Sequence, residues 1–160
     1  MRIRPATPTD RPAVWAIIGP VFRAGDSYAI DPDISEHDAL AYWLRPGQET
    51  FVAEAGREIL GTYYIRANQG GGGDHVCNCG YITSPAARGR GIARAMAAHS
   101  LAQARHRGFL GMQFNFVVAT NLGAIHLWET LGFATVGRLP QAFRHPTDGL
   151  VDALIMYRAV

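Results

Sequence analysis

The chain has 160 residues, of which 48% are hydrophobic and 18% charged, as expected of one globular domain with a sizeable core. Its net charge of +2 argues against a general nucleic-acid binder, and no apolar run approaches the length that spans a bilayer. The first ten residues lack the hydrophobic region of a signal peptide, so we expect a cytoplasmic protein without nucleic-acid or membrane partners.

The first half of the chain predicts two helices and four strands. A helix that begins after Thr9 or Asp10 carries apolar residues at helical spacing, and Pro20 disturbs its end. A second helix, Ala39–Leu44, follows a capping sequence that starts at Ser35. The segments with strand character are Ile3–Thr7, Thr50–Ala55, Ile59–Arg66 and His75–Thr83.

The second half predicts two further helices and three further strands. The long helix Gly89–Arg107 carries a band of alanines that can lie flat on a sheet, and Asn121–Leu131 is a shorter helix. The strands are Met112–Ala119, Phe133–Leu139 and Leu150–Arg158, the last two joined by a long loop, Pro140–Gly149. We therefore predict a single α+β domain over residues 1–160, with a mixed, mostly antiparallel sheet.

Alternation along the strand Met112–Ala119 predicts two distinct faces. One face carries Met112, Phe114, Phe116 and Val118, and the other carries Gln113, Asn115 and Val117.

A short basic turn rich in glycine leads into the long helix, in the segment Arg88-Gly89-Arg90-Gly91-Ile92-Ala93. A helix start gathers free backbone N–H groups and the positive end of the helix dipole. Glycine lets that backbone approach a ligand closely, and the arginines can add charge-assisted hydrogen bonds. We therefore predict that this segment binds a phosphate or pyrophosphate, and that the protein is an enzyme.

The pattern Arg88-x-x-Gly91-x-Ala93 resembles the pyrophosphate-binding motif of the GNAT superfamily of acyl-CoA-dependent N-acetyltransferases, and Pro85 fits it too. A second block, Asn121-x-x-Ala124-x-x-Leu127-Trp128-Glu129-Thr130-Leu131-Gly132-Phe133, is similar to the helix and strand start that follow in that superfamily. The element order matches over nearly the whole chain. The resemblance implies about seven strands flanked by about four helices, with the sheet splayed between the fourth and fifth strands.

The resemblance also implies that acetyl-CoA lies in the gap between those strands, with no metal. Its pantetheine amides are expected to pair with backbone groups of Tyr81, Ile82 and Thr83, and its pyrophosphate to lie on the turn that starts at Arg88. The thioester oxygen is expected to meet a strand N–H that acts as an oxyanion site.

The segments Asn78-Cys79-Gly80-Tyr81 and Gln113-Phe114-Asn115-Phe116-Val117-Val118 look like those of yeast-type N-acetyltransferases that act on proline analogues such as azetidine-2-carboxylate. That resemblance associates Asn78 and Asn115 with the acceptor, where we expect them to be catalytic and substrate-binding residues, and Asn121 with CoA. Phe116 is carried over with them as a substrate-binding residue. An unpaired buried amide costs about 1–3 kcal/mol, so Asn115, in a run of large apolar residues, is expected to be buried with partners. Its alternative role is a structural bond across the strand gap, and Asn121 is also a preferred helix N-cap.

Two positions depart from the superfamily pattern. Where many of its enzymes have a tyrosine that protonates the CoA thiolate, this chain has Trp128, whose indole cannot release a proton near neutral pH, so we predict core packing for it. The fourth strand also lacks the carboxylate that draws a proton from the amine in many relatives. Deprotonating a lysine at pH 7 costs roughly 4.6 kcal/mol, against about 1.4 kcal/mol for a peptide N-terminus, which argues against protein lysines as acceptors.

Cys77 and Cys79 are two residues apart on one predicted strand, an awkward spacing for a disulfide. A metal site would need further ligands at suitable spacing, which are not evident. We therefore predict that both cysteines pack on the strand face opposite Asn78.

We expect an enzyme that transfers acetyl from acetyl-CoA to a small amine, such as an amino or imino acid, by direct attack in a ternary complex. Two alternatives stay open. One is a protein N-terminal or lysine acetyltransferase, and the other is a non-catalytic acyl-CoA-binding sensor, suggested by the missing carboxylate and tyrosine. A homodimer is the default expectation for the assembly.

Overall fold

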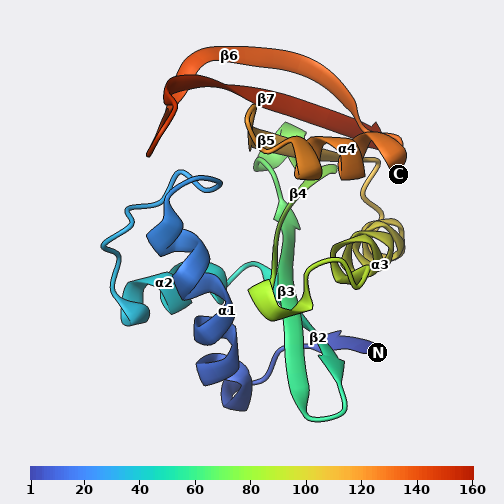
Figure 1. The fold of residues 1–160 in the computed structure, drawn as a ribbon. Helices are drawn as coiled ribbons and strands as arrows, with labels where there is room; N and C mark the ends of the chain where they lie inside the picture. Colours follow the sequence, from blue (N-terminus) through green and yellow to red (C-terminus); the bar gives the residue numbers. More distant parts are fainter.

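The computed structural model describes residues 1–160 and contains one seven-stranded sheet with four helices on its faces (Figure 1). In sheet order the strands are β1 (Arg2–Pro5), β2 (Glu49–Ala55), β3 (Glu58–Ala67), β4 (Val76–Thr83), β5 (Gly111–Val118), β7 (Gly149–Ala159) and β6 (Ala134–His145). The helices are α1 (Arg11–Ala24), α2 (Glu36–Trp43), α3 (Ile92–His106) and α4 (Leu122–Thr130). Neighbouring strands are antiparallel except β4 and β5, which run parallel. These observations confirm the predicted α+β class and mixed sheet.

Two apolar clusters cover the two faces of the sheet, with α1 and α2 on one side and α3 on the other (Figure 1). Alternation along β4 divides its side chains between them, because successive residues of a strand point to opposite faces. Cys77 and Cys79 join the cluster under α3, whereas Ile82 joins the cluster under α1 and α2. The prediction that the cysteines pack opposite Asn78 is therefore confirmed. No helix is long and apolar enough to cross a membrane.

The first helix is longer than its sequence suggests. α1 continues through Pro20 to Ala24 and ends at Gly25, whose φ of 64° forms a left-handed cap. Proline cannot donate the backbone hydrogen bond of a helix interior. Beyond it, Phe22 is buried with 1% of its surface exposed, so packing of this last turn outweighs the lost bond.

The prediction of a long loop between the last two strands is wrong. β6 extends to His145, and only residues 146–148 separate it from β7 (Figure 1). A bulge between Leu139 and Phe143 takes up Pro140, which lacks the N–H that a regular ladder requires. Strand pairing then resumes between Phe143 and Val151, and the Phe143 side chain is buried.

A carboxylate joins the first strand to the start of α1. Asp10 accepts two hydrogen bonds from the Arg4 guanidinium, at 2.7 and 2.9 Å, and one from the backbone N–H of Thr7 at 2.7 Å. Arg4 also donates to Glu54 on β2 at 2.8 Å. The Arg4 hydrogen bonds, followed by those from Thr7, outweigh the effect of burial and hold the pKa of Asp10 well below its usual value.

Replacing Asp10 by asparagine is expected to lower the free energy of unfolding at neutral pH by about 2 kcal/mol, because Arg4 loses an ionised partner. Since the pKa of Asp10 is depressed in the folded state, its stabilisation is complete above the unfolded-state pKa of about 3.9 and is lost as the pH falls toward the folded-state value. Urea unfolding across acidic pH measures both effects. The Asp10→Asn variant should lose less stability on acidification than the wild type, and parallel curves would contradict this assignment.

Candidate functional site

β4 and β5 pair only at their first residues and then separate. The register joins Val76 to Gly111 and Cys77 to Met112, and no further pair follows. Where the strands part, Nδ2 of Asn78 donates to the backbone oxygen of Gln113 at 2.9 Å. The predicted splay between the fourth and fifth strands is therefore confirmed.

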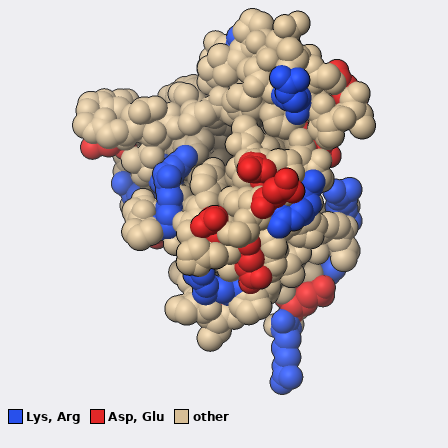
Figure 2. Space-filling model, turned by 90° about the vertical axis from the view of Figure 1, so that its left-hand side faces the viewer, with Lys and Arg blue, Asp and Glu red and all other residues tan.

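The gap opens into a cavity of about 550 Å³, within the usual range for small-molecule sites. Besides β4 and β5, residues 26–30 between α1 and α2 and the beginning of α4 line it. Its charged lining residues are Asp26, Arg66 and Arg88. Figure 2 shows the surface hollowed below its upper part, with basic and acidic side chains interspersed over that face.

A bulge in β5 changes which side chains reach the cavity. Phe114 pairs with Met156 and Val117 with Leu154, so two β5 residues lie opposite one residue of β7. The predicted alternation consequently fails after Phe114. The pattern placed Phe116 on the same face as Phe114, whereas in the structure it is Val117 that joins Phe114 in the cluster under α3. The bulge leaves Asn115 exposed at the edge of the cavity, which corrects the expectation that its amide is buried.

The turn before α3 leaves a group of backbone donors free. A 3-10 turn, η3 (Pro85–Ala87), is followed by Gly89 and Gly91, which both have a φ of 74°. This left-handed backbone places the start of α3 at Ile92 rather than at the predicted Gly89. Between Arg88 and Arg94, the N–H groups that make no hydrogen bond within the protein are those of Gly89, Gly91, Ile92, Ala93 and Arg94.

These free N–H groups meet at the positive end of a 15-residue helix, the usual arrangement of an anion site. The side chains of Arg88 and Arg90 are exposed beside them. Arg88 and Ala93 also line the cavity, so the turn and the gap between the strands belong to one continuous site. The arrangement can bind a pyrophosphate at one end of the cavity.

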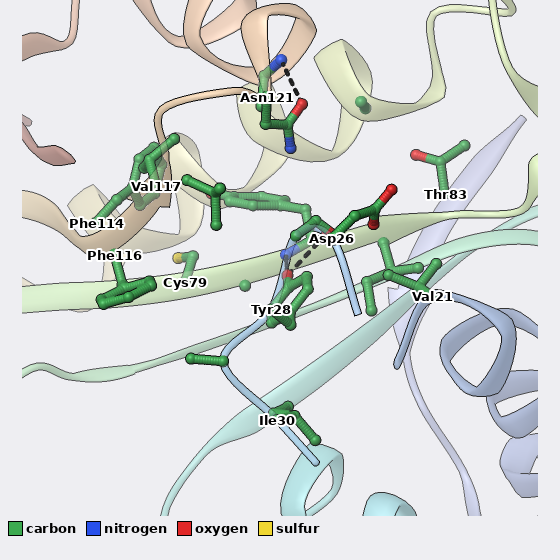
Figure 3. Close-up of a pocket in the computed structure, with 18 of the residues that line it drawn as sticks. Val21, Asp26, Tyr28, Ile30, Cys79, Thr83, Phe114, Phe116, Val117 and Asn121 are labelled. Carbon is green, nitrogen blue, oxygen red and sulfur yellow. Dashed lines mark hydrogen bonds between the residues drawn. The ribbon is translucent and has the colours of Figure 1, made fainter. Parts of the chain in front are cut away.

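Tyr28, from the connection between α1 and α2, lies against the β4 backbone. Its hydroxyl accepts a hydrogen bond from the N–H of Tyr81 and donates one to the Tyr81 carbonyl, both at 3.0 Å. Burial raises the pKa of Tyr28, so the hydroxyl stays neutral and can make both bonds. In Figure 3 Tyr28 lies between Phe116 and Cys79 on one side and Val21 and Thr83 on the other. Sequence reasoning missed this contact.

The two acceptor asparagines predicted from the sequence lie on opposite sides of the gap and line the same cavity. Asn78 is buried, with 6% of its surface exposed. Nδ2 of Asn115 donates to Oδ1 of Asn68 at 2.6 Å, and its own oxygen accepts from Nε2 of Gln113 at 2.9 Å. Phe116 lines the cavity as well and packs edge to face on Phe143 at 6.1 Å. Sequence reasoning named both asparagines but missed the amide network that orients Asn115.

Asn121 caps α4 as the sequence suggests, because its side-chain oxygen accepts from the backbone N–H of Ala124 at 3.3 Å. It also lines the cavity, at the upper end of the close-up in Figure 3. Capping uses only the oxygen of the amide, so its nitrogen remains available to a ligand.

Comparison with known proteins identifies the family. Residues 13–133 match the family described as Acetyltransferase (GNAT) family. The chain belongs to the GNAT family. It is 32% identical over 148 residues to the N-acetyltransferase aca1 of Schizosaccharomyces pombe, an alignment that covers 82% of this chain and 71% of that protein.

Solved GNAT structures share the whole fold. A GCN5-related N-acetyltransferase from Kribbella flavida is 36% identical, with a TM-score of 0.94, and the match covers 99% of this chain and 97% of that one. The putative acetyltransferase yncA from Salmonella typhimurium, solved with its cofactor acetyl-CoA, has the same fold at 21% identity and a TM-score of 0.86, with 99% and 93% of the two chains covered. The protein is thus an N-acetyltransferase of the GNAT family.

Trp128, which the family resemblance aligns with the tyrosine that protonates the CoA thiolate in many GNAT enzymes, packs in the core as predicted. It is 8% exposed, and its ring lies 4.7 Å from that of Phe114 and 5.0 Å from that of Tyr81. The Tyr81 hydroxyl is itself held by Ser100 at 2.7 Å, and burial raises its pKa well above the usual value. Neither aromatic side chain is suited to protonate a thiolate.

The chemistry of the cysteines is equally limited. Cys79 lines the cavity but is buried, and desolvation raises the pKa of its thiol well above the usual value. A thiol nucleophile requires a lowered pKa, so Cys79 is not suited to carry the acetyl group. No group of three or more histidine, cysteine, aspartate or glutamate side chains is arranged to hold a metal ion.

Proposed function

We propose that the protein acetylates the amine of a small molecule, and that an amino or imino acid is the substrate class, as in the yeast-type enzymes that the sequence resembles. The observation that carries this proposal is the extent of one cavity, which is lined by Arg88 at the anion corner and by Asn78 and Asn115 at the other end. A cosubstrate bound along β4 would bring its acetyl group toward these amides. Residues 26–30 also line the cavity, which favours a compact acceptor.

Direct attack of the amine on the thioester is the chemistry that these residues support. Holding two reactants together supplies a large effective concentration, and one oriented N–H can stabilise the developing oxyanion. We assign that N–H to Tyr81, the first of the three β4 residues whose backbone groups are expected to pair with the cosubstrate. The raised pKa of Cys79 supports a mechanism without an acyl-enzyme.

The proposal is tested by incubating the purified protein with acetyl-CoA and a panel of free amines, amino acids, imino acids and peptides. Release of CoA thiol and the mass of each product are followed. We expect acetylated amino or imino acids, and an unchanged protein mass with acetyl-CoA alone. Acetylated peptides in place of small amines would favour a protein acetyltransferase. Binding of acetyl-CoA without turnover of any amine would favour a sensor.

Replacing Tyr28 by phenylalanine is expected to tighten acetyl-CoA binding by about 5- to 10-fold. The Tyr28 hydroxyl occupies both main-chain groups of Tyr81, so a thioester oxygen can reach that N–H only by displacing it. A neutral hydrogen bond contributes about 0.5–1.5 kcal/mol net. In the variant no hydroxyl has to be displaced, and the N–H of Tyr81 stays without a partner until the thioester oxygen binds, so acetyl-CoA should gain about this much binding free energy. Isothermal titration calorimetry measures the change.

The control for this variant is Tyr63→Phe. It also removes a hydroxyl, which contacts Nδ1 of His99 at 2.6 Å on the α3 side of the sheet, away from the cavity. Acetyl-CoA affinity should be unchanged in the control. Weaker binding by the Tyr28→Phe protein would contradict the assignment of Tyr81 to the thioester oxygen.

A further inference from the structure

Arg66 is a cavity residue that neither the motifs nor the family resemblance single out. It lies near the end of β3, where the register places it directly opposite Asn78 on β4. Residues directly opposite each other in an antiparallel pair project to the same face, with Cβ atoms about 5 Å apart. Arg66 and Asn78 both line the cavity, so the guanidinium belongs to the acceptor end of the site.

The Arg66 charge has no partner in the protein. Three arginines form ion pairs: Arg4 with Asp10 and Glu54, Arg107 with Glu49, and Arg138 with Asp152. Arg66 forms none, and its Nε is the one buried side-chain nitrogen or oxygen without a hydrogen bond. The guanidinium carbon lies 5.5 Å from the centre of the Tyr64 ring, a contact that orients the plane but accepts no hydrogen bond.

The two cationic side chains of the cavity lie at opposite ends of β4. Arg88 follows the last residues of the strand, whereas Arg66 is level with Asn78 near its beginning. Five residues of extended chain separate Asn78 from Thr83, which corresponds to about 17 Å. A pyrophosphate on the turn at Arg88 therefore leaves Arg66 for a second anion.

We propose that Arg66 binds the carboxylate of the acceptor, so that the enzyme selects amines that carry a carboxylate close to the nitrogen. A guanidinium presents paired N–H donors that match a carboxylate, and a partly buried, unpaired charge is stabilised by such a partner. Asn78, on the same face, lies where it can contact the neighbouring amine. This inference rests on the proposed function, since it concerns the acceptor of the same transfer.

The test compares acceptors that differ only in the carboxylate. L-proline and azetidine-2-carboxylate are assayed beside their primary amides, with a panel of free amino acids and their amides. For the wild type we expect kcat/KM to be about 10- to 100-fold higher for the acid than for the amide. In Arg66→Gln this ratio should fall to near one, and Arg66→Lys should restore part of it. Comparing the ratio between variants cancels differences in amine basicity.

Two further measurements separate selection from folding. Arg66→Gln should bind acetyl-CoA with wild-type affinity, because the cosubstrate site lies toward the other end of β4. Arg57→Gln removes an exposed arginine outside the cavity and should leave the acid-to-amide ratio unchanged. If the wild type acetylates acids and amides equally, or if Arg66→Gln keeps the wild-type ratio, the carboxylate role is wrong while the proposed function stands. If no small amine is acetylated, the proposed function fails first and this inference fails with it.

Discussion

The double variant Arg88→Ala/Arg90→Ala is expected to bind acetyl-CoA about 100-fold more weakly than the wild type. Each guanidinium can form charge-assisted hydrogen bonds with a pyrophosphate, and both are exposed, so together they should contribute about 3 kcal/mol. The free N–H groups of the turn remain, so binding should be weakened and not abolished. Calorimetric titration measures the affinity directly.

The matched control for this variant is Arg57→Ala/Arg105→Ala, which removes the same charge from two other exposed positions. A general electrostatic attraction would weaken both double variants equally and would contradict the assignment. Wild-type affinity should also fall with rising salt, and the Arg88→Ala/Arg90→Ala variant should respond less because two screened contacts are absent.

Replacing Asn115 by alanine is expected to lower kcat/KM for the acceptor about 10- to 100-fold while acetyl-CoA affinity stays nearly intact. Asn115 is exposed at the cavity edge, and Asn68 and Gln113 hold its amide in place, so the change removes a preorganised polar group and leaves the core untouched. Steady-state kinetics with varied acceptor, together with calorimetry for acetyl-CoA, separates the two quantities.

Gln69→Ala serves as the control, because it removes an amide from the same loop as Asn68 without altering the lining of the cavity. It should leave both measurements unchanged. Equal losses of turnover and acetyl-CoA affinity in Asn115→Ala would show that Asn115 supports the splayed strands as a whole, the structural role that the sequence also allows.

The parts of the site that the sequence predicts are those encoded by neighbouring residues. Gly89 and Gly91 mark the turn because glycine readily adopts the left-handed backbone that both residues have there. This conformation separates η3 from α3 and leaves the first N–H groups of α3 exposed. Asn121 marks a helix start through its own capping bond. Such signals depend on a few consecutive residues, and the structure bears both out.

Other features depend on contacts between distant segments and give no local signal. The β5 bulge is set by pairing with β7, so alternation assigned Val117 to the wrong face. The run of large apolar residues around Asn115 likewise suggested a buried position, whereas the side chain is exposed. Tyr28 meets β4 across 53 residues of sequence. Arg66 is distinctive because its buried Nε has no hydrogen-bond partner in the folded protein, which the sequence alone does not reveal.

A crystal structure with bound acetyl-CoA tests the central claim most directly. We predict the diphosphate on the free N–H groups between Gly89 and Arg94, with the thioester in the gap between β4 and β5 and the Tyr28 hydroxyl displaced from Tyr81. A diphosphate bound at any other surface, with this turn left empty, would contradict the account.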